Sequence, residues 1–231
     1  MRNHVPDGKV FFVAPCFLIA EKLSESDQKR IVYWGHWQSG QDSPVARNLS
    51  PYDVLDTIFG FLNDVRLYPK LKHVLFCGYS AGGQVISRYM AVARIKARKG
   101  LSFSFAAGAP SSWLFLNDKE DWHYGLNTRN RRYVSQLSKS RMFKNIKSRH
   151  LVCVCGTEDT GSKYLSMNPR AVRQGTNRYE RFKNFRTHIS TFKELKDSFE
   201  FFEVEGVGHD SGGCWRGIDF ARLVMGQRII Q

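Results

Sequence analysis

Residues 74–83 read Val-Leu-Phe-Cys-Gly-Tyr-Ser-Ala-Gly-Gly, and this stretch decides the fold. An apolar run stops here at a Gly-x-Ser-x-Gly pentapeptide centred on Ser80. A glycine on each side of the serine allows a very tight strand-to-helix turn, because a Cβ at either position would clash. Such a turn places the serine oxygen at the carboxyl end of a sheet, within reach of a base. The pattern predicts Ser80 as a catalytic nucleophile, in preference to a serine at an ordinary helix start.

The sequence on both sides of the pentapeptide fits this prediction. Val74–Phe76 is a short apolar run of the kind expected for a buried strand. Basic residues ahead of Gly100 indicate a helix end. Between them, apolar residues recur with helical spacing at Val85, Ile86, Tyr89, Met90 and Ala93. We therefore expect a strand, a tight turn at Ser80 and a helix that ends close to residue 100.

Length and composition favour a single α/β domain over residues 1–231. The chain has 42% apolar residues, which is enough for a well-packed core. Short apolar runs alternate with helical periods, a pattern typical of βαβ units and a parallel sheet. A capped helix is predicted from Ser50 and a closing helix around 219–230. Besides the strand before Ser80, strands are predicted at residues 10–14, 101–105, 151–155 and 199–204.

Residues 110–149 form a polar stretch dotted with aromatic side chains that is too long for an ordinary connection. Segments of this kind are commonly lids or binding loops, so we expect a lid or pocket insertion here. Trp113 and Tyr124, together with Phe115 and Trp122, are candidates for lining a substrate pocket. Packing in a core or within the lid is the alternative for these rings.

No stretch approaches the roughly 20 apolar residues that a membrane-spanning helix requires. Residues 10–20 follow basic residues, as the apolar part of a signal peptide would. Pro15 interrupts this run, however, and no small-x-small cleavage site precedes Glu21. The sequence therefore favours a buried strand followed by a loop, and a cytoplasmic location.

The formal net charge of +14 is unusual for a hydrolytic enzyme. The basic residues are spread widely, with a modest concentration between Arg129 and Arg149, and no recognised nucleic-acid-binding motif accompanies them. We expect these residues to form a solvated basic face, and no nucleic-acid partner is predicted. Attraction to anionic lipid, nucleic acid or an acidic substrate is the alternative, but charge alone fixes no partner.

The five cysteines show neither paired nor metal-binding spacing. Cys77, Cys153 and Cys155 fall in predicted buried strands, which suggests reduced thiols that act as small apolar residues. No zinc site is predicted, and a serine mechanism needs neither a metal nor a cofactor.

A serine hydroxyl becomes a useful nucleophile when an imidazole removes its proton, and a carboxylate must hold that imidazole in the correct tautomer. Two loops that follow predicted strands can supply these groups. Residues 156–160 read GTEDT, and residues 206–210 read GVGHD. We assign Asp159 as the orienting acid, with Glu158 as an adjacent competitor, and His209 as the general base. Asp210 is expected to be structural.

The tetrahedral intermediate of acyl transfer carries an oxyanion that needs two preorganised N–H donors. The backbone N–H of Ala81, directly after the nucleophile, is the first predicted donor. The second commonly comes from a loop after an earlier strand. Residues 15–17 are a weak candidate for this loop.

Taken together, these motifs resemble the α/β-hydrolase superfamily. More narrowly, the chain is similar to an esterase-like branch of serine hydrolases found in fungi, plants and bacteria, with distant similarity to esterases and polyester depolymerases. The matching segments run through nearly the whole chain. They are VAPCF at 13–17, GYSAGGQ at 78–84, RY at 88–89, PSSWL at 110–114, YGL at 124–126, GTEDT at 156–160, QGTNRYER at 174–181 and GVGHD at 206–210.

The resemblance implies an α/β-hydrolase-type, mostly parallel sheet flanked by helices. It also implies a Ser80–Asp159–His209 triad that hydrolyses a carboxylic ester or related acyl bond of a small-molecule substrate. Members of this branch usually carry further strands and a His-Gly oxyanion loop ahead of the segment at 13–17. The resemblance therefore implies a sheet that is shortened at its N-terminal side. The alternative function is a catalytically impaired binding or interaction protein that lacks a complete oxyanion hole.

Overall fold

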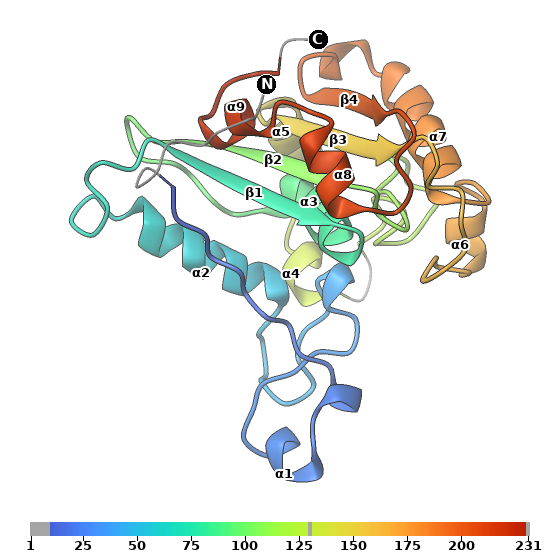
Figure 1. The fold of residues 1–231 in the computed structure, drawn as a ribbon. Coiled ribbons are helices and arrows are strands. Elements are labelled where there is room, and N and C mark those ends of the chain that lie inside the picture. Colours follow the sequence, from blue (N-terminus) through green and yellow to red (C-terminus); the bar gives the residue numbers. More distant parts are fainter. Residues whose placement is uncertain (1–9, 129–130, 230–231) are drawn as a thin grey trace.

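The computed structural model describes residues 10–128 and 131–229, which build a parallel sheet with helices packed on both faces (Figure 1). The sheet has four strands in the order β1-β2-β3-β4, which is also their order along the chain. The carboxyl ends of all four strands therefore meet at one edge of the sheet. The strands are β1 (His73–Tyr79), β2 (Ser102–Gly108), β3 (Leu151–Gly156) and β4 (Phe199–Val204).

Three helices make the crossovers between neighbouring strands: α3 (Ala81–Val92), α5 (Lys139–Lys147) and α7 (Arg178–Ser190). The remaining helices are α1 (Glu25–Gln28), α2 (Pro51–Asn63), α4 (Arg132–Ser135), α6 (Pro169–Val172), α8 (Ser211–Arg216) and α9 (Phe220–Val224), with 3-10 turns η1 (Ala20–Lys22), η2 (Trp37–Ser39) and η3 (Lys193–Leu195). No helix in the described part of the chain is long and apolar enough to cross a membrane.

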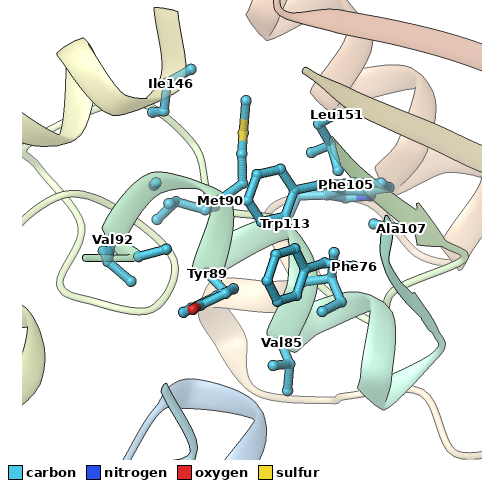
Figure 2. Close-up of a cluster of buried hydrophobic side chains, with 14 of the residues drawn as sticks. Phe76, Val85, Tyr89, Met90, Val92, Phe105, Ala107, Trp113, Ile146 and Leu151 are labelled. Carbon is cyan, nitrogen blue, oxygen red and sulfur yellow. The ribbon is translucent and has the colours of Figure 1, made fainter. Parts of the chain in front are cut away.

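The larger core lies on the face of the sheet that α2, α3, α5 and α7 cover. The strand register places Phe76 beside Phe105, Phe105 beside Leu151, and Leu151 beside Phe199, so one row of large side chains crosses the whole sheet. Figure 2 shows part of this cluster, with Met90 and Trp113 close to the sheet residues. Alternate residues point to the other face, because side chains in a strand alternate. Ala106, Val152 and Val154 pack there against α8 and α9.

The helix predicted from Ser50 is present as α2, and its first turn explains why it starts there. The Ser50 hydroxyl accepts a hydrogen bond from the N–H of Tyr52 (3.0 Å), and the Asp53 carboxylate accepts one from the N–H of Ser50 (2.8 Å). Pro51 occupies the first helical position, where its missing N–H costs nothing. This reciprocal capping satisfies N–H groups that a helix start otherwise leaves unpaired.

The helix after Ser80 ends at Val92, so the prediction that it continues close to residue 100 was wrong. Its last carbonyls are bound by side chains from a later part of the chain. The buried Arg149 guanidinium donates to the carbonyls of Met90 (2.5 Å) and Ala93 (2.7 Å), and Asn145 donates to Ala91 (2.9 Å). A cation at the carboxyl end of a helix also interacts favourably with the helix dipole. The helix therefore stops where this tertiary cap binds it.

We expect Arg149→Ala to lower the free energy of unfolding by about 3 kcal/mol, because two charge-assisted hydrogen bonds are lost and buried carbonyls are left without partners. Urea unfolding followed by circular dichroism measures the change. Arg141→Ala is the matched control, because Arg141 lies exposed on α5. An equal loss of stability in both variants would contradict the capping role of Arg149.

Three further expectations need correction. Residues 10–14 form no strand, because no described strand pairs with this apolar run, and Phe12 is 82% exposed. The closing helix is short: α9 covers Phe220–Val224 of the range predicted around 219–230, whose last residue lies outside the described part of the chain. Cys77 is exposed on β1, whereas Cys153 and Cys155 are buried in β3 as expected.

The segment 110–149 contributes side chains to the main core. Trp113, Leu114, Leu116, Trp122 and Leu126 are all buried in that cluster. The segment also contains α4 and α5, of which α5 packs against α3. Its role as a lid or pocket wall stays a prediction.

Part of the positive charge is buried instead of forming a solvated basic face. Arg88, Arg178 and Arg181 are among the largest fully buried side chains of the structure. The Arg88 guanidinium donates to the carbonyls of Gln38 (2.6 Å) and His123 (3.3 Å). The net charge therefore overstates the number of cations that a partner could meet.

Candidate active site

Ser80 lies between the end of β1 and the start of α3, as the sequence predicts. Its backbone has φ 54° and ψ −115°, a conformation that non-glycine residues rarely adopt and that is common at functional turns. The Ser80 N–H donates to the carbonyl of Gly108 at the end of β2 (2.8 Å), and its carbonyl accepts from the N–H of Gln84 (3.0 Å). The neighbouring strand and the new helix therefore hold the strained turn on both sides.

The glycines around the serine have unequal roles, which corrects the expectation that both flanking glycines are sterically required. A Cβ on Gly78 would lie 2.4 Å from the backbone of Gly82, and a Cβ on Gly83 would lie 2.6 Å from the Gly108 carbonyl oxygen. A Cβ on Gly82 would meet nothing within 4 Å. The close approaches are thus made by Gly78 and by Gly83, the residue after the pentapeptide.

The structure brings Ser80, His209 and Asp159 together. His209 Nε2 lies 3.0 Å from Ser80 Oγ, and His209 Nδ1 lies 2.7 Å from Asp159 Oδ2. Asp159 lies in the loop after β3 and His209 in the loop after β4. Both loops are at the carboxyl edge of the sheet, where Ser80 follows β1. The acid bonded to the imidazole is Asp159, not its neighbour Glu158.

The carboxylate and the imidazole have different surroundings. Asp159 is buried, with 1% of its side chain exposed, whereas 29% of the His209 side chain is exposed. A carboxylate at Nδ1 favours a proton on that nitrogen and leaves the lone pair of Nε2 directed at the serine oxygen. This tautomer allows the imidazole to accept the serine proton.

Tyr79 supports the imidazole and was not singled out in the sequence. The Tyr79 and His209 ring centroids are 5.1 Å apart, and Trp215 packs edge-on against the Tyr79 ring. The Tyr79 hydroxyl lies 3.6 Å from Cys214 Sγ. Burial is the main cause that raises the pKa of Tyr79, so the phenol stays neutral beside the imidazole. As expected, Asp210 is structural: its carboxylate caps α8 by accepting from the N–H groups of Gly212 and Gly213.

Ala81 is the first residue of α3, so its N–H belongs to the turn that has no intrahelical acceptor. The positive end of the helix dipole lies at the same place. A groove of about 620 Å³ is lined by Gly82, the residue after Ala81, and by residues 73–77 of β1. Residues 10–17 also line it, so the candidate second-donor segment 15–17 borders the same groove. The oxyanion roles of Ala81 and of this segment stay predictions.

Trp113 and Tyr124, the candidate substrate-contacting rings, are both buried. Trp113 stacks on Phe185, with ring centroids 4.6 Å apart, and Tyr124 packs against His123 at 4.4 Å. Both backbone groups of Trp113 are bound by the Gln174 side chain, at 2.8 and 2.9 Å. Core packing accounts for the position of Trp113, and contact of either ring with substrate stays a prediction.

Comparison with known proteins adds structural neighbours only. No protein-family model and no curated protein matches the chain. LpqC, the poly(3-hydroxybutyrate) depolymerase from Bordetella parapertussis, superposes with a TM-score of 0.63 and 18% identity over 84% of this chain. Poly(aspartic acid) hydrolase-1 from Sphingomonas sp. KT-1 gives a TM-score of 0.63 and 18% identity over 82% of the chain.

This chain spans 64% of the length of the depolymerase and 70% of that of the hydrolase. At this level of identity the likeness concerns the fold. The parallel sheet, its flanking helices and these neighbours together show that the chain has the α/β-hydrolase fold.

Proposed function

We propose that this protein is a serine hydrolase that cleaves a carboxylic ester or a related acyl bond through an acyl-enzyme. The observation that carries the proposal is the hydrogen-bonded chain from Ser80 Oγ through His209 to Asp159. The two structural neighbours support hydrolysis, since one bears the name of a depolymerase and the other that of a hydrolase.

In the first half-reaction, Ser80 Oγ attacks the carbonyl carbon of the substrate while His209 Nε2 takes the serine proton. The 3.0 Å separation of these atoms allows direct transfer. The imidazolium that forms is stabilised by Asp159, whose Oδ2 accepts from Nδ1–H. The tetrahedral intermediate then collapses, His209 gives its proton to the leaving alcohol, and Ser80 is left as an ester of the acyl group.

In the second half-reaction, water takes the place of the leaving alcohol. His209 removes a proton from the water, which attacks the acyl carbon, and a second tetrahedral intermediate forms. Its collapse returns the proton to Ser80 Oγ and releases the carboxylic acid. In both intermediates the Ala81 N–H donates to the oxyanion, and a backbone N–H from residues 15–17 is the proposed second donor.

The test is covalent labelling of the folded protein with a fluorophosphonate, followed by mass spectrometry of the modified peptide. We expect one adduct on Ser80, and hydrolysis of short p-nitrophenyl esters. Ser80→Ala should remove both, because no other group in the triad can form the acyl-enzyme. Ser140→Ala, at an exposed position of α5, is the control that retains both.

Folded wild-type protein that neither labels nor hydrolyses the esters would contradict the proposal. Labelling at Ser80 without turnover would instead support the alternative of an impaired, hydrolase-like binding protein, because an incomplete oxyanion hole slows every tetrahedral step.

A further inference from the structure

The segment 174–181, QGTNRYER, contacts both the acid loop, residues 156–160, and the loop after β2. The triad mechanism assigns no role to this segment. We propose that Arg178 in this segment is a positioning residue that holds the Asp159 carboxylate in the orientation His209 requires. Arg178 acts through the triad of the proposed function, on which this role rests.

Asp159 and Arg178 form a buried ion pair. Each side chain is 1% exposed, and Arg178 Nη1 lies 3.6 Å from Asp159 Oδ1. Burying a lone carboxylate is costly, and a guanidinium placed beside it offsets part of that cost. The two oxygens of Asp159 have different partners. Oδ2 accepts a hydrogen bond from His209. Oδ1 has no hydrogen bond within the described residues and faces the Arg178 guanidinium. A rotation of the carboxylate would weaken both interactions.

The backbone holds Arg178 at the start of α7. The Asn177 side chain caps this helix by accepting from the N–H of Glu180 (2.8 Å). The Tyr179 N–H donates to the carbonyl of Asp159 (3.2 Å), so the first turn of α7 binds the acid loop directly. The Arg178 Nη2 group donates to the carbonyl of Lys163 (3.0 Å). The guanidinium is therefore fixed from the helix and from the loop that follows Asp159.

The same segment also binds the loop after β2. Gln174 holds the backbone of Trp113, and the Arg181 guanidinium donates to the carbonyls of Ser111 and Gly175. A Cβ on Gly175 would lie 2.9 Å from the backbone nitrogen of Arg181. Gly175 also has a φ of +148°, so this tight turn needs glycine. The segment thus links two loops at the carboxyl edge of the sheet and holds Arg178 beside Asp159.

The test compares Arg178→Met, which removes the charge but keeps much of the volume, with Arg178→Lys. For Arg178→Met we expect kcat for a p-nitrophenyl ester to fall about 10²-fold with little change in KM, because the misplaced acid affects the chemical step. Arg178→Lys should recover part of kcat, because the lysine keeps a positive charge beside Asp159.

Arg181→Met is the matched control, because Arg181 is buried in the same segment but has no contact with Asp159 among its hydrogen bonds. It should lower the midpoint of urea unfolding and leave kcat and KM close to the wild-type values. A loss of kcat in Arg178→Met no larger than in Arg181→Met, or one that Arg178→Lys does not reduce, would overturn the positioning role.

A double-mutant cycle on urea unfolding tests the ion pair without any activity. Arg178→Met and Asp159→Asn should each lower the midpoint, because each leaves one buried charge alone, and the double variant should recover much of the loss. Additive losses would overturn the pairing. If this cycle shows coupling but Ser80 does not react with the fluorophosphonate, the proposed function fails while the ion pair stands.

Discussion

Replacing His209 by alanine is expected to lower kcat/KM for a p-nitrophenyl ester by at least about 10³-fold, because the members of a triad act as a unit. The loss has a direct geometric cause. Without the imidazole, Ser80 Oγ loses the acceptor that lies 3.0 Å from it, and the leaving group lacks its acid. Initial rates at fixed protein concentration, with folding checked by circular dichroism, measure the effect.

Asp159→Asn should also lower kcat/KM by at least about 10³-fold. The asparagine amide cannot serve as an anionic acceptor for Nδ1–H, so it leaves His209 in the wrong tautomer. Glu158→Gln is the control for this variant. Glu158 precedes Asp159 in the same loop, but the 2.7 Å hydrogen bond to His209 belongs to Asp159. A large loss in Glu158→Gln together with an active Asp159→Asn would show that the acid assignment is wrong.

Gly78→Ala is expected to lower the free energy of unfolding by about 3 kcal/mol and to abolish labelling of Ser80. The added Cβ would lie 2.4 Å from backbone atoms of Gly82, and backbone cannot rotate away as a flexible side chain can. The turn must open to relieve this contact, which moves Ser80 Oγ away from His209. Thermal unfolding and fluorophosphonate labelling measure the two effects.

Gly82→Ala is the matched control for stability. Its Cβ would meet nothing within 4 Å, and the residue lies in the first turn of α3, where alanine is a better helix former than glycine. We expect its thermal stability to equal or exceed that of the wild type. A Gly82→Ala variant as unstable as Gly78→Ala would contradict the account of the turn.

The strands β1, β2, β3 and β4 and the capped start of α2 could be predicted because their signals are local. Apolar runs of strand length and the Ser-Pro-x-Asp capping pattern depend on residues close together in the chain. The run at residues 10–14 carries the same local signal but forms no strand, because strand formation also requires a partner strand. The sequence could not show whether one was present.

The positions of Ser80, Asp159 and His209 could also be predicted, although these residues are distant in sequence. Each follows a strand, and a parallel sheet collects the carboxyl ends of its strands at one edge, so topology brings the three loops together. Arg178 could not be assigned a role in this way. It begins a helix, and its contact with Asp159 depends on how α7 packs beside β3.

By itself, the sequence determined the fold class, the strand-to-helix turn at Ser80 and the order of the acid and base loops. These follow from short-range steric rules and from the regular geometry of a parallel sheet. Only the tertiary structure decided that Gly83, and not Gly82, makes the second close approach, that Arg149 ends α3, and that Arg178 faces the acid. Each of these depends on atoms from segments far apart in the chain, and their approach is set by packing of the whole domain.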